Sequence, residues 1–158
     1  MFQRILIPLD GSQTAAEALP HARALALRFG STIHLVRAVP TLGELAEVAT
    51  PSVAAQAAVS QDVISRLDSA KEQTEARQYL DTVGKELAAD GIKVETRVRS
   101  GAPAEQILDA AKVASADLIV LTAYGAGGAH TRSERAVYGG VADEVLRLSR
   151  TPVLLIRP

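Results

Sequence analysis

Short apolar segments alternate along the chain with longer segments in which apolar residues recur at helical spacing. The short segments are rich in β-branched residues and are bounded by glycine, proline or polar turn residues, which is typical of strands. They predict five β-strands, at residues 5–9, 32–36 (continuing to 38 and 39), 92–98, 118–122 and 153–156. The third alternates between apolar and polar positions, so we expect it to be a half-buried edge strand.

Between these strands, apolar residues lie three and four positions apart, which predicts helices. The first helix follows the turn Asp10-Gly11-Ser12, with Ser12 as its N-cap, and ends at Gly30. A long helix runs from about residue 61 to residue 89, and another begins at Pro103. The expected inner faces, in chain order, are Leu19, Ala22, Ala26 and Phe29; Leu80, Val83 and Leu87; Ile107, Ala110, Ala111 and Ala114; and Val141, Val145 and Leu148.

Strands that alternate with helices favour a parallel sheet covered on both faces, which is an α/β fold. The 158 residues fit one domain, and neither an internal repeat nor a linker divides them. Residues 41–60 have no clean period and are expected to form a loop with some local helix. We therefore expect a single domain over residues 1–158, with a variable helical or loop segment at about residues 41–75.

Composition narrows the possible functions. The net charge is −1 and aromatic residues make up 3% of the chain, which argues against a nucleic-acid binder. There is no cysteine, so disulfides and zinc thiolate sites are excluded. No apolar run reaches membrane-spanning length, and the chain enters its first strand without a signal-peptide pattern. We expect a cytoplasmic protein that binds neither nucleic acid nor membrane.

Glycines gather after the fourth predicted strand, at Gly125, Gly127 and Gly128, and again at Gly139 and Gly140 before the last helix. Glycines let backbone N–H groups approach an anion closely, and a helix N-terminus adds a partial positive charge. The segment is therefore a candidate anion site, although the same glycines could serve loop geometry alone.

Several enzyme classes lack their sequence motifs here. The glycines do not form the dinucleotide G-x-G-x-x-G motif, and there is no P-loop or Gly-x-Ser-x-Gly motif. His21 and His34 are interpreted as structural, and His130 as a neutral loop residue. Arg132 and Arg135 are equally consistent with solvated loop charges and with phosphate contacts. No catalytic or metal-ligating group of residues is predicted.

Three sequence segments resemble the universal stress protein family. They are ILIPLDGS at the start, the residues Gly101-Ala-Pro103 before a helix, and TAYGAGG followed by GGVADEVLRLSRTPVLLIRP at the end. The resemblance spans almost the whole chain in order, except residues 41–75, and its last forty residues are the most specific part.

The resemblance implies an adenine nucleotide alpha hydrolase-like fold, an open, doubly wound sheet of five parallel strands in the order 3-2-1-4-5. It implies ATP, possibly with Mg²⁺, and a homodimer formed through the last strand between Pro152 and Ile156. Asp10 would contact adenine or ribose, and Val39 would pack on the base. The implied nucleotide site comprises Pro8, Leu9, Asp10, Val39, Thr122, Gly125, Gly127, Gly128, Arg132, Gly139, Gly140 and Val141.

The chain departs from the family's phosphate motif at three points. Thr122 replaces its first glycine, Gly140 replaces its final Ser or Thr, and 13 residues rather than nine separate Gly125 from Gly139. Three functions stay open. They are an ATP-binding stress or signalling module with at most slow hydrolysis, a homodimeric interaction module of the same fold that binds no nucleotide, and a small nucleotidyl-transfer or hydrolytic enzyme.

Overall fold

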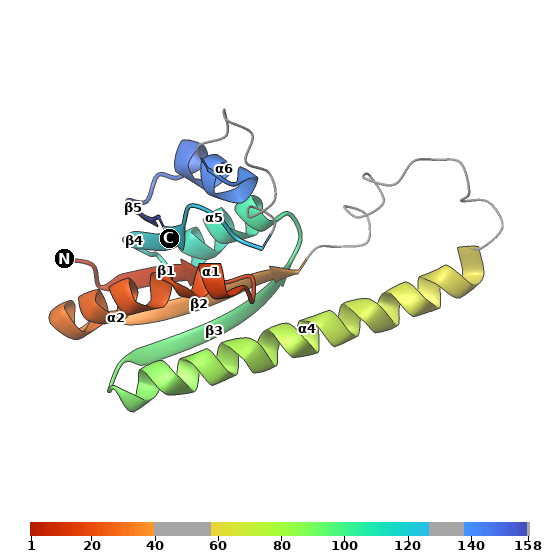
Figure 1. Ribbon diagram of the computed structural model, residues 1–158, viewed down its shortest axis with the longest axis horizontal. Helices are drawn as coiled ribbons and strands as arrows, with labels where there is room; N and C mark the ends of the chain where they lie inside the picture. Colours follow the sequence, from red (N-terminus) through yellow and green to blue (C-terminus); the bar gives the residue numbers. More distant parts are fainter. Residues whose placement is uncertain (40–57, 127–137, 158) are drawn as a thin grey trace.

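A central parallel sheet organises the chain in the computed structural model, which describes residues 1–39, 58–126 and 138–157, with only the backbone of residues 58–68 (Figure 1). The strands are β1 (Arg4–Pro8), β2 (Thr32–Val39), β3 (Lys93–Ser100), β4 (Leu118–Thr122) and β5 (Val153–Ile156). All four strand pairs are parallel, in the order β3-β2-β1-β4-β5. The predicted strand order and the edge position of β3 are confirmed.

Helices cover both faces of this sheet, which makes the fold doubly wound. They are α1 (Gln13–Ala16), α2 (Ala18–Phe29), α4 (Ala58–Ala89), α5 (Pro103–Val113) and α6 (Gly140–Leu148). Side chains of α2 and α4 pack on Ile5 and Ile7 of β1, whereas α5 and α6 pack on the opposite face, beside Leu6. Alternate residues of one strand thus supply two separate cores, because successive side chains of a strand point to opposite faces.

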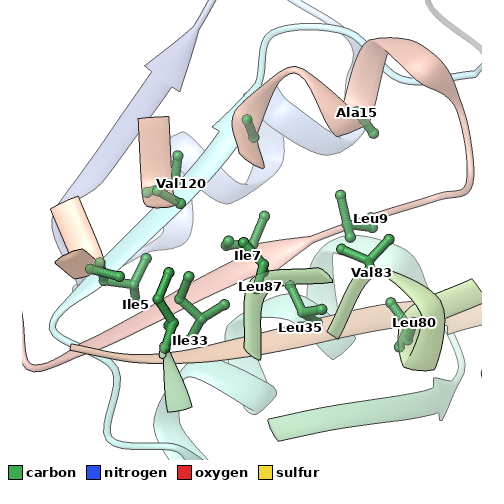
Figure 2. Close-up of a cluster of buried hydrophobic side chains, with 14 of the residues drawn as sticks. Ile5, Ile7, Leu9, Ala15, Ile33, Leu35, Leu80, Val83, Leu87 and Val120 are labelled. Atoms are coloured by element: carbon green, nitrogen blue, oxygen red, sulfur yellow. The ribbon is translucent and has the colours of Figure 1, made fainter. Parts of the chain in front are cut away.

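The core beneath α2 and α4 is the larger of the two clusters, and Figure 2 shows its apolar side chains. Leu80, Val83 and Leu87 of α4 are buried, as their spacing predicts. Leu80 is fully buried in this cluster with Leu35 of β2. The contact between α4 and the sheet therefore rests on one apolar stripe in the second half of a 32-residue helix.

Several boundaries and inner faces differ from the prediction. The expected first helix is interrupted at Glu17, whose N–H donates to the carbonyls of Thr14 and Ala15. The predicted Ser12 N-cap is confirmed, since its side chain accepts from the N–H of Ala15. Residues 58–60, expected in a loop, already belong to α4. Small residues carry the buried face of α2, at Ala18, Ala22 and Ala26.

Larger apolar residues predicted on inner faces lie partly outside the core. Phe29 is 37% exposed and packs edge-on against Phe2, while Leu148 is 58% exposed. In α6 the buried residues are Ala142 and Val145, and Val141 is 40% exposed. Val145 is therefore buried as predicted, whereas Ala142 takes the buried position expected for Val141. Ala114, predicted inside α5, is its C-cap.

His34 of β2 is buried, and neither ring nitrogen has a hydrogen-bond partner. Its Nδ1 lies 3.4 Å from Oε2 of Glu95. Burial lowers the pKa of His34; the negative charge of Glu95 opposes this shift, and the positive charges of Arg97 and Arg4 add to it. The net pKa lies below the ordinary value of 6.5. A histidine that resists protonation in the fold makes the folded state less stable in acid.

The free energy of unfolding is therefore expected to decrease as the pH falls below about 6.5, because the unfolded chain then binds a proton that the folded chain resists. Urea unfolding at about pH 7.5 and about pH 5.5 measures this difference. His34→Gln should reduce the difference, whereas His21→Gln, at an exposed position, should leave it unchanged. An equal pH dependence in wild type and His34→Gln would contradict the assignment.

Candidate functional site

A hollow of about 900 Å³ lies at the carboxyl ends of β1 and β4. The strand order reverses there, since β1 pairs with β2 on one side and with β4 on the other. Open α/β sheets bind their ligands at this kind of switch point. The lining residues are Pro8, Leu9, Asp10, Ala15, Val36, Ala38, Pro103, Ile107, Leu121, Thr122, Ala123, Tyr124, Gly125, Ala126, Tyr138, Gly139, Gly140, Val141, Ala142 and Asp143.

Asp10 connects two segments that are more than one hundred residues apart in the sequence. Its Oδ1 accepts from the N–H of Ser12 at 2.8 Å and from the hydroxyl of Ser12 at 2.6 Å. Its Oδ2 accepts from the N–H of Ala126 at 2.7 Å. Because a carboxylate offers about four acceptor positions, these three bonds leave about one for a ligand.

Burial raises the pKa of Asp10, but hydrogen bonds from the Ser12 hydroxyl and from the N–H groups of Ala126 and Ser12 lower it by more. The net pKa therefore lies below the ordinary value of 3.8. Asp10 is ionised at neutral pH, which makes it a hydrogen-bond acceptor for a ligand hydroxyl and a poor proton donor.

Gly125 lies directly against this carboxylate. An ideal Cβ placed on Gly125 would collide with Oδ2 of Asp10. The collision is with a side chain already fixed by three hydrogen bonds, so it cannot be relieved without breaking them. A glycine at this position thus permits the close approach of Asp10 to the start of the glycine-rich segment.

The amino end of α6 borders the same hollow. Gly139 is the N-cap, and its N–H donates to the carbonyl of Ala123 at 2.8 Å, which joins the helix start to the end of β4. A Cβ on Gly139 would lie 3.4 Å from that carbonyl oxygen, whereas a Cβ on Gly140 would meet no atom within 4 Å. The first amides of a helix have no acceptor within the helix, so this end of α6 is suited to an anion.

The side chains of Thr122 and Tyr138, which line the hollow, form hydrogen bonds within the protein. The Thr122 hydroxyl donates to the carbonyl of Tyr124 at 2.6 Å. The Tyr138 hydroxyl accepts from Arg157 at 2.9 Å, and the Arg157 guanidinium lies 5.5 Å from the centre of the Tyr138 ring. These contacts hold Thr122 and Tyr138 in the wall of the hollow, and Tyr138 lies just before the start of α6.

The structure brings most of the predicted site residues together. Those that line the hollow are Pro8, Leu9, Asp10, Thr122, Gly125, Gly139, Gly140 and Val141. Gly127, Gly128 and Arg132, with His130 and Arg135, lie outside the described residues. Val39 does not line the hollow; it is buried, and its carbonyl accepts from the N–H of Gly101 at 3.0 Å.

Sequence analysis missed the apolar wall of the hollow. Val36 and Ala38 of β2 line it instead of Val39, because alternate residues of a strand face the same side. Pro103 and Ile107 of α5 complete this wall. The apolar face of α5 is visible in its spacing, but the sequence alone does not show that its first turn meets the hollow. Among the described residues, no three His, Cys, Asp or Glu side chains are grouped to hold a metal ion.

A doubly wound parallel sheet with a hollow at its switch point defines an open α/β protein, and this is the place where such sheets bind small molecules. The chain belongs to the universal stress protein family, whose profile matches residues 1–157. This confirms the resemblance seen at both ends of the sequence.

Two named relatives match nearly the full chain. Universal stress protein MJ0531 of Methanocaldococcus jannaschii is 32% identical over 99% of this chain and 83% of its own length. Universal stress protein Sll1388 of Synechocystis is 30% identical over 99% of this chain and 98% of its own length.

Solved structures show the same fold. The structure of MJ0577 matches with a TM-score of 0.80 and 25% identity, over 100% of this chain and 97% of that one. A universal stress protein in complex with cAMP matches with a TM-score of 0.64 and 21% identity, over 99% and 97% of the two chains. A universal stress protein from Archaeoglobus fulgidus in complex with dAMP has a TM-score of 0.58 and 18% identity, over 99% and 98%. Within the described part of this chain, no helix has both the length and the apolar character needed to cross a membrane.

Proposed function

We propose that this chain is an ATP-binding member of the family that acts as a nucleotide-responsive stress or signalling module rather than as a dedicated enzyme. The observation that carries the proposal is the contact of ionised Asp10 with Gly125 and Ala126 at the rim of a hollow of about 900 Å³. Family structures in complex with cAMP and dAMP support an adenine nucleotide as the ligand class.

The residues of the hollow fit the three parts of a nucleotide. Val36, Ala38 and Ile107 provide an apolar surface for the base. The remaining acceptor position of Asp10 suits a ribose hydroxyl. The amides at the amino end of α6, beginning at Gly140, suit phosphate oxygens. Mg²⁺, if it accompanies ATP, would bind mainly through the phosphates, as this ion does in most nucleotide sites.

The chemistry of the hollow supports binding rather than turnover. A general base needs a pKa near the working pH, and the pKa of Asp10 is lowered instead. Thr122 already donates its hydroxyl to the Tyr124 carbonyl, so it is not positioned as a nucleophile. At most, slow hydrolysis would follow from binding.

Isothermal titration of ATP with magnesium into nucleotide-free protein tests the proposal directly. Saturable binding is expected, and Asp10→Ala should weaken it by about tenfold or more, since a hydrogen bond to a charged group is lost. Asp90→Ala is a control that should leave the affinity unchanged, because it removes a carboxylate that pairs with Arg23 and does not line the hollow. Absence of heat, with no change in melting temperature at millimolar ATP, would favour the nucleotide-free interaction module.

We also propose that the protein forms a homodimer through β5. This strand ends the sheet, and its four residues are all half-buried in the single chain. The carbonyl of Pro152 accepts from Ile119 of β4 and that of Ile156 from Ala123, the residue after β4, so the N–H and C=O of Leu155 point to the free edge. A second copy pairing there would cover an edge that is otherwise open to association.

Leu155→Pro is expected to weaken this dimer roughly tenfold or more, because each chain loses one outward N–H donor in a two-fold symmetric interface. The internal ladder should survive, since proline is tolerated where the N–H faces away from the neighbouring strand. Sedimentation equilibrium measures the change, with Leu155→Ala as the control that shortens the side chain and keeps the donor. Equal dissociation constants for the two variants would contradict pairing through this edge.

A further inference from the structure

Arg37 of β2 extends to the opposite face of the sheet from the hollow. Its neighbours Val36 and Ala38 line the hollow, and successive side chains of a strand alternate. Its guanidinium lies 5.6 Å from the centre of the Tyr79 ring on α4. This distance is within the range of a cation–π contact. Arg37 thus connects the long helix α4 to the carboxyl end of the sheet.

The same guanidinium lies over Gly11, the residue after Asp10. An ideal Cβ on Gly11 would lie 2.9 Å from Nη1, 3.2 Å from Cζ and 3.3 Å from Nη2 of Arg37. Three similar distances indicate that the planar group lies flat against the turn. Gly11 has φ of +88°, a conformation that glycine adopts without steric cost. The positive φ of the turn therefore favours glycine here, and a larger residue would also displace the Arg37 guanidinium.

Within the part of the chain that the structure describes, Arg37 lies against a ring and a turn rather than against a carboxylate. Among the ion pairs formed by the described residues, none includes Arg37. Burial raises the pKa of Tyr79, the negative charge of Asp10 raises it further, and the positive charge of Arg37 lowers it. The charges of Asp10 and Arg37 therefore both act on the Tyr79 hydroxyl. Arg37 is half-buried, and its guanidinium lies against the Tyr79 ring and the Gly11 turn. Its effect on the turn is therefore steric.

The turn that Arg37 covers holds the Asp10 carboxylate in place. Ser12, the residue after Gly11, donates both its N–H and its hydroxyl to Oδ1 of Asp10. A shift of the Gly11 peptide would move these donors relative to the carboxylate. It would also disturb the bond from the Ala126 N–H to Oδ2, on the other side of the turn.

We propose that Arg37 is a positioning residue for Asp10: its guanidinium, held over Tyr79, supports the Gly11 peptide and so sets the carboxylate at the nucleotide hollow. The nucleotide part of this inference rests on the proposed function. The geometric part does not, because it concerns the bonds from Ser12 and Ala126 to Asp10. A consequence is that a change in the position of α4 at Tyr79 alters the ligand site from the far face of the sheet.

Arg37→Met tests the inference, since methionine keeps a long apolar side chain and loses the planar group. Amide hydrogen exchange by NMR at Ser12 and Ala126 measures the two bonds without any ligand, and both amides should exchange about fivefold faster. ATP affinity should fall about fivefold, and in the Asp10→Ala background Arg37→Met should have no further effect. Arg77→Met, which removes a charge from an exposed position of α4, should change neither quantity.

Unchanged amide exchange at Ser12 and Ala126 in Arg37→Met would overturn the inference. It would also be overturned if Arg37→Met lowered ATP affinity as much in the Asp10→Ala background as in the wild type. If wild-type protein binds no ATP while these amides still respond, the proposed function fails and the positioning role stands. If Arg37→Met does not fold, Tyr79→Leu decides by the same two amides, because it removes the ring beneath the guanidinium. Arg37→Lys, which keeps the charge without the planar group, should behave like Arg37→Met.

Discussion

Gly125→Val is expected to lower ATP affinity by at least about tenfold while the protein stays folded. The new Cβ would collide with Oδ2 of Asp10, the oxygen that accepts from the Ala126 N–H. Relief requires Asp10 to move, which breaks hydrogen bonds to a charged group that are each worth about 1.5–3 kcal/mol. Since about 1.4 kcal/mol corresponds to a tenfold change in affinity, the loss of one such bond accounts for the expected effect.

Titration calorimetry measures the change in ATP affinity. A matched substitution at a second glycine separates the effect of the collision with Asp10 from the general effect of replacing a glycine. Gly140→Ala also removes a glycine from the hollow, but its Cβ would meet no atom within 4 Å. Gly125 has no positive φ, so valine meets no backbone strain there and the circular dichroism spectrum should match wild type. Equal affinities for Gly125→Val and Gly140→Ala would show that the contact with Asp10 does not support the ligand site.

The five strands and the position of Asp10 after the first of them could be predicted because they depend on local patterns in the sequence, whereas the strand order was implied by the family resemblance. Apolar runs such as residues 118–122 are buried on both faces of a parallel sheet, and turn residues follow where the strand ends. Asp10 directly follows β1, so its position at the carboxyl edge follows from the order of elements. Gly125 follows β4 in the same way, so the order of elements agrees with the single site for Asp10 and Gly125 that the family resemblance implies.

The contacts that complete the site depend on exact register and on long-range packing. The family resemblance implies a base contact at Val39, whereas Ala38, one residue earlier, lines the hollow, and one position along a strand reverses the face of the sheet. The contact of Arg37 with Tyr79 joins β2 to α4, elements separated by a segment without clear periodicity. Neither residue belongs to a motif, and only the position of α4 on the sheet brings them together.

Leu80→Ala is expected to destabilise the protein more than any other substitution considered above, by about 2–5 kcal/mol. Leu80 is fully buried among the side chains of α4 and the sheet, next in sequence to Tyr79, and Figure 2 shows it beside Leu35. Removing three of its carbons leaves a cavity that a close-packed core fills only in part. For a chain of this size the melting temperature should fall by about 4–20 °C.

Thermal unfolding at a fixed protein concentration measures this effect, because the proposed dimer would make the melting temperature depend on concentration. Leu27→Ala is the matched control: Leu27 lies on α2, on the same face of the sheet, but is 54% exposed, so its loss should cost no more than about 0.5 kcal/mol. Similar melting temperatures for the two variants would contradict the anchoring of α4 through this stripe. A large decrease for Leu80→Ala alone would establish that α4, and with it the position of Tyr79 beside Arg37, is held to the sheet by burial rather than by surface charge.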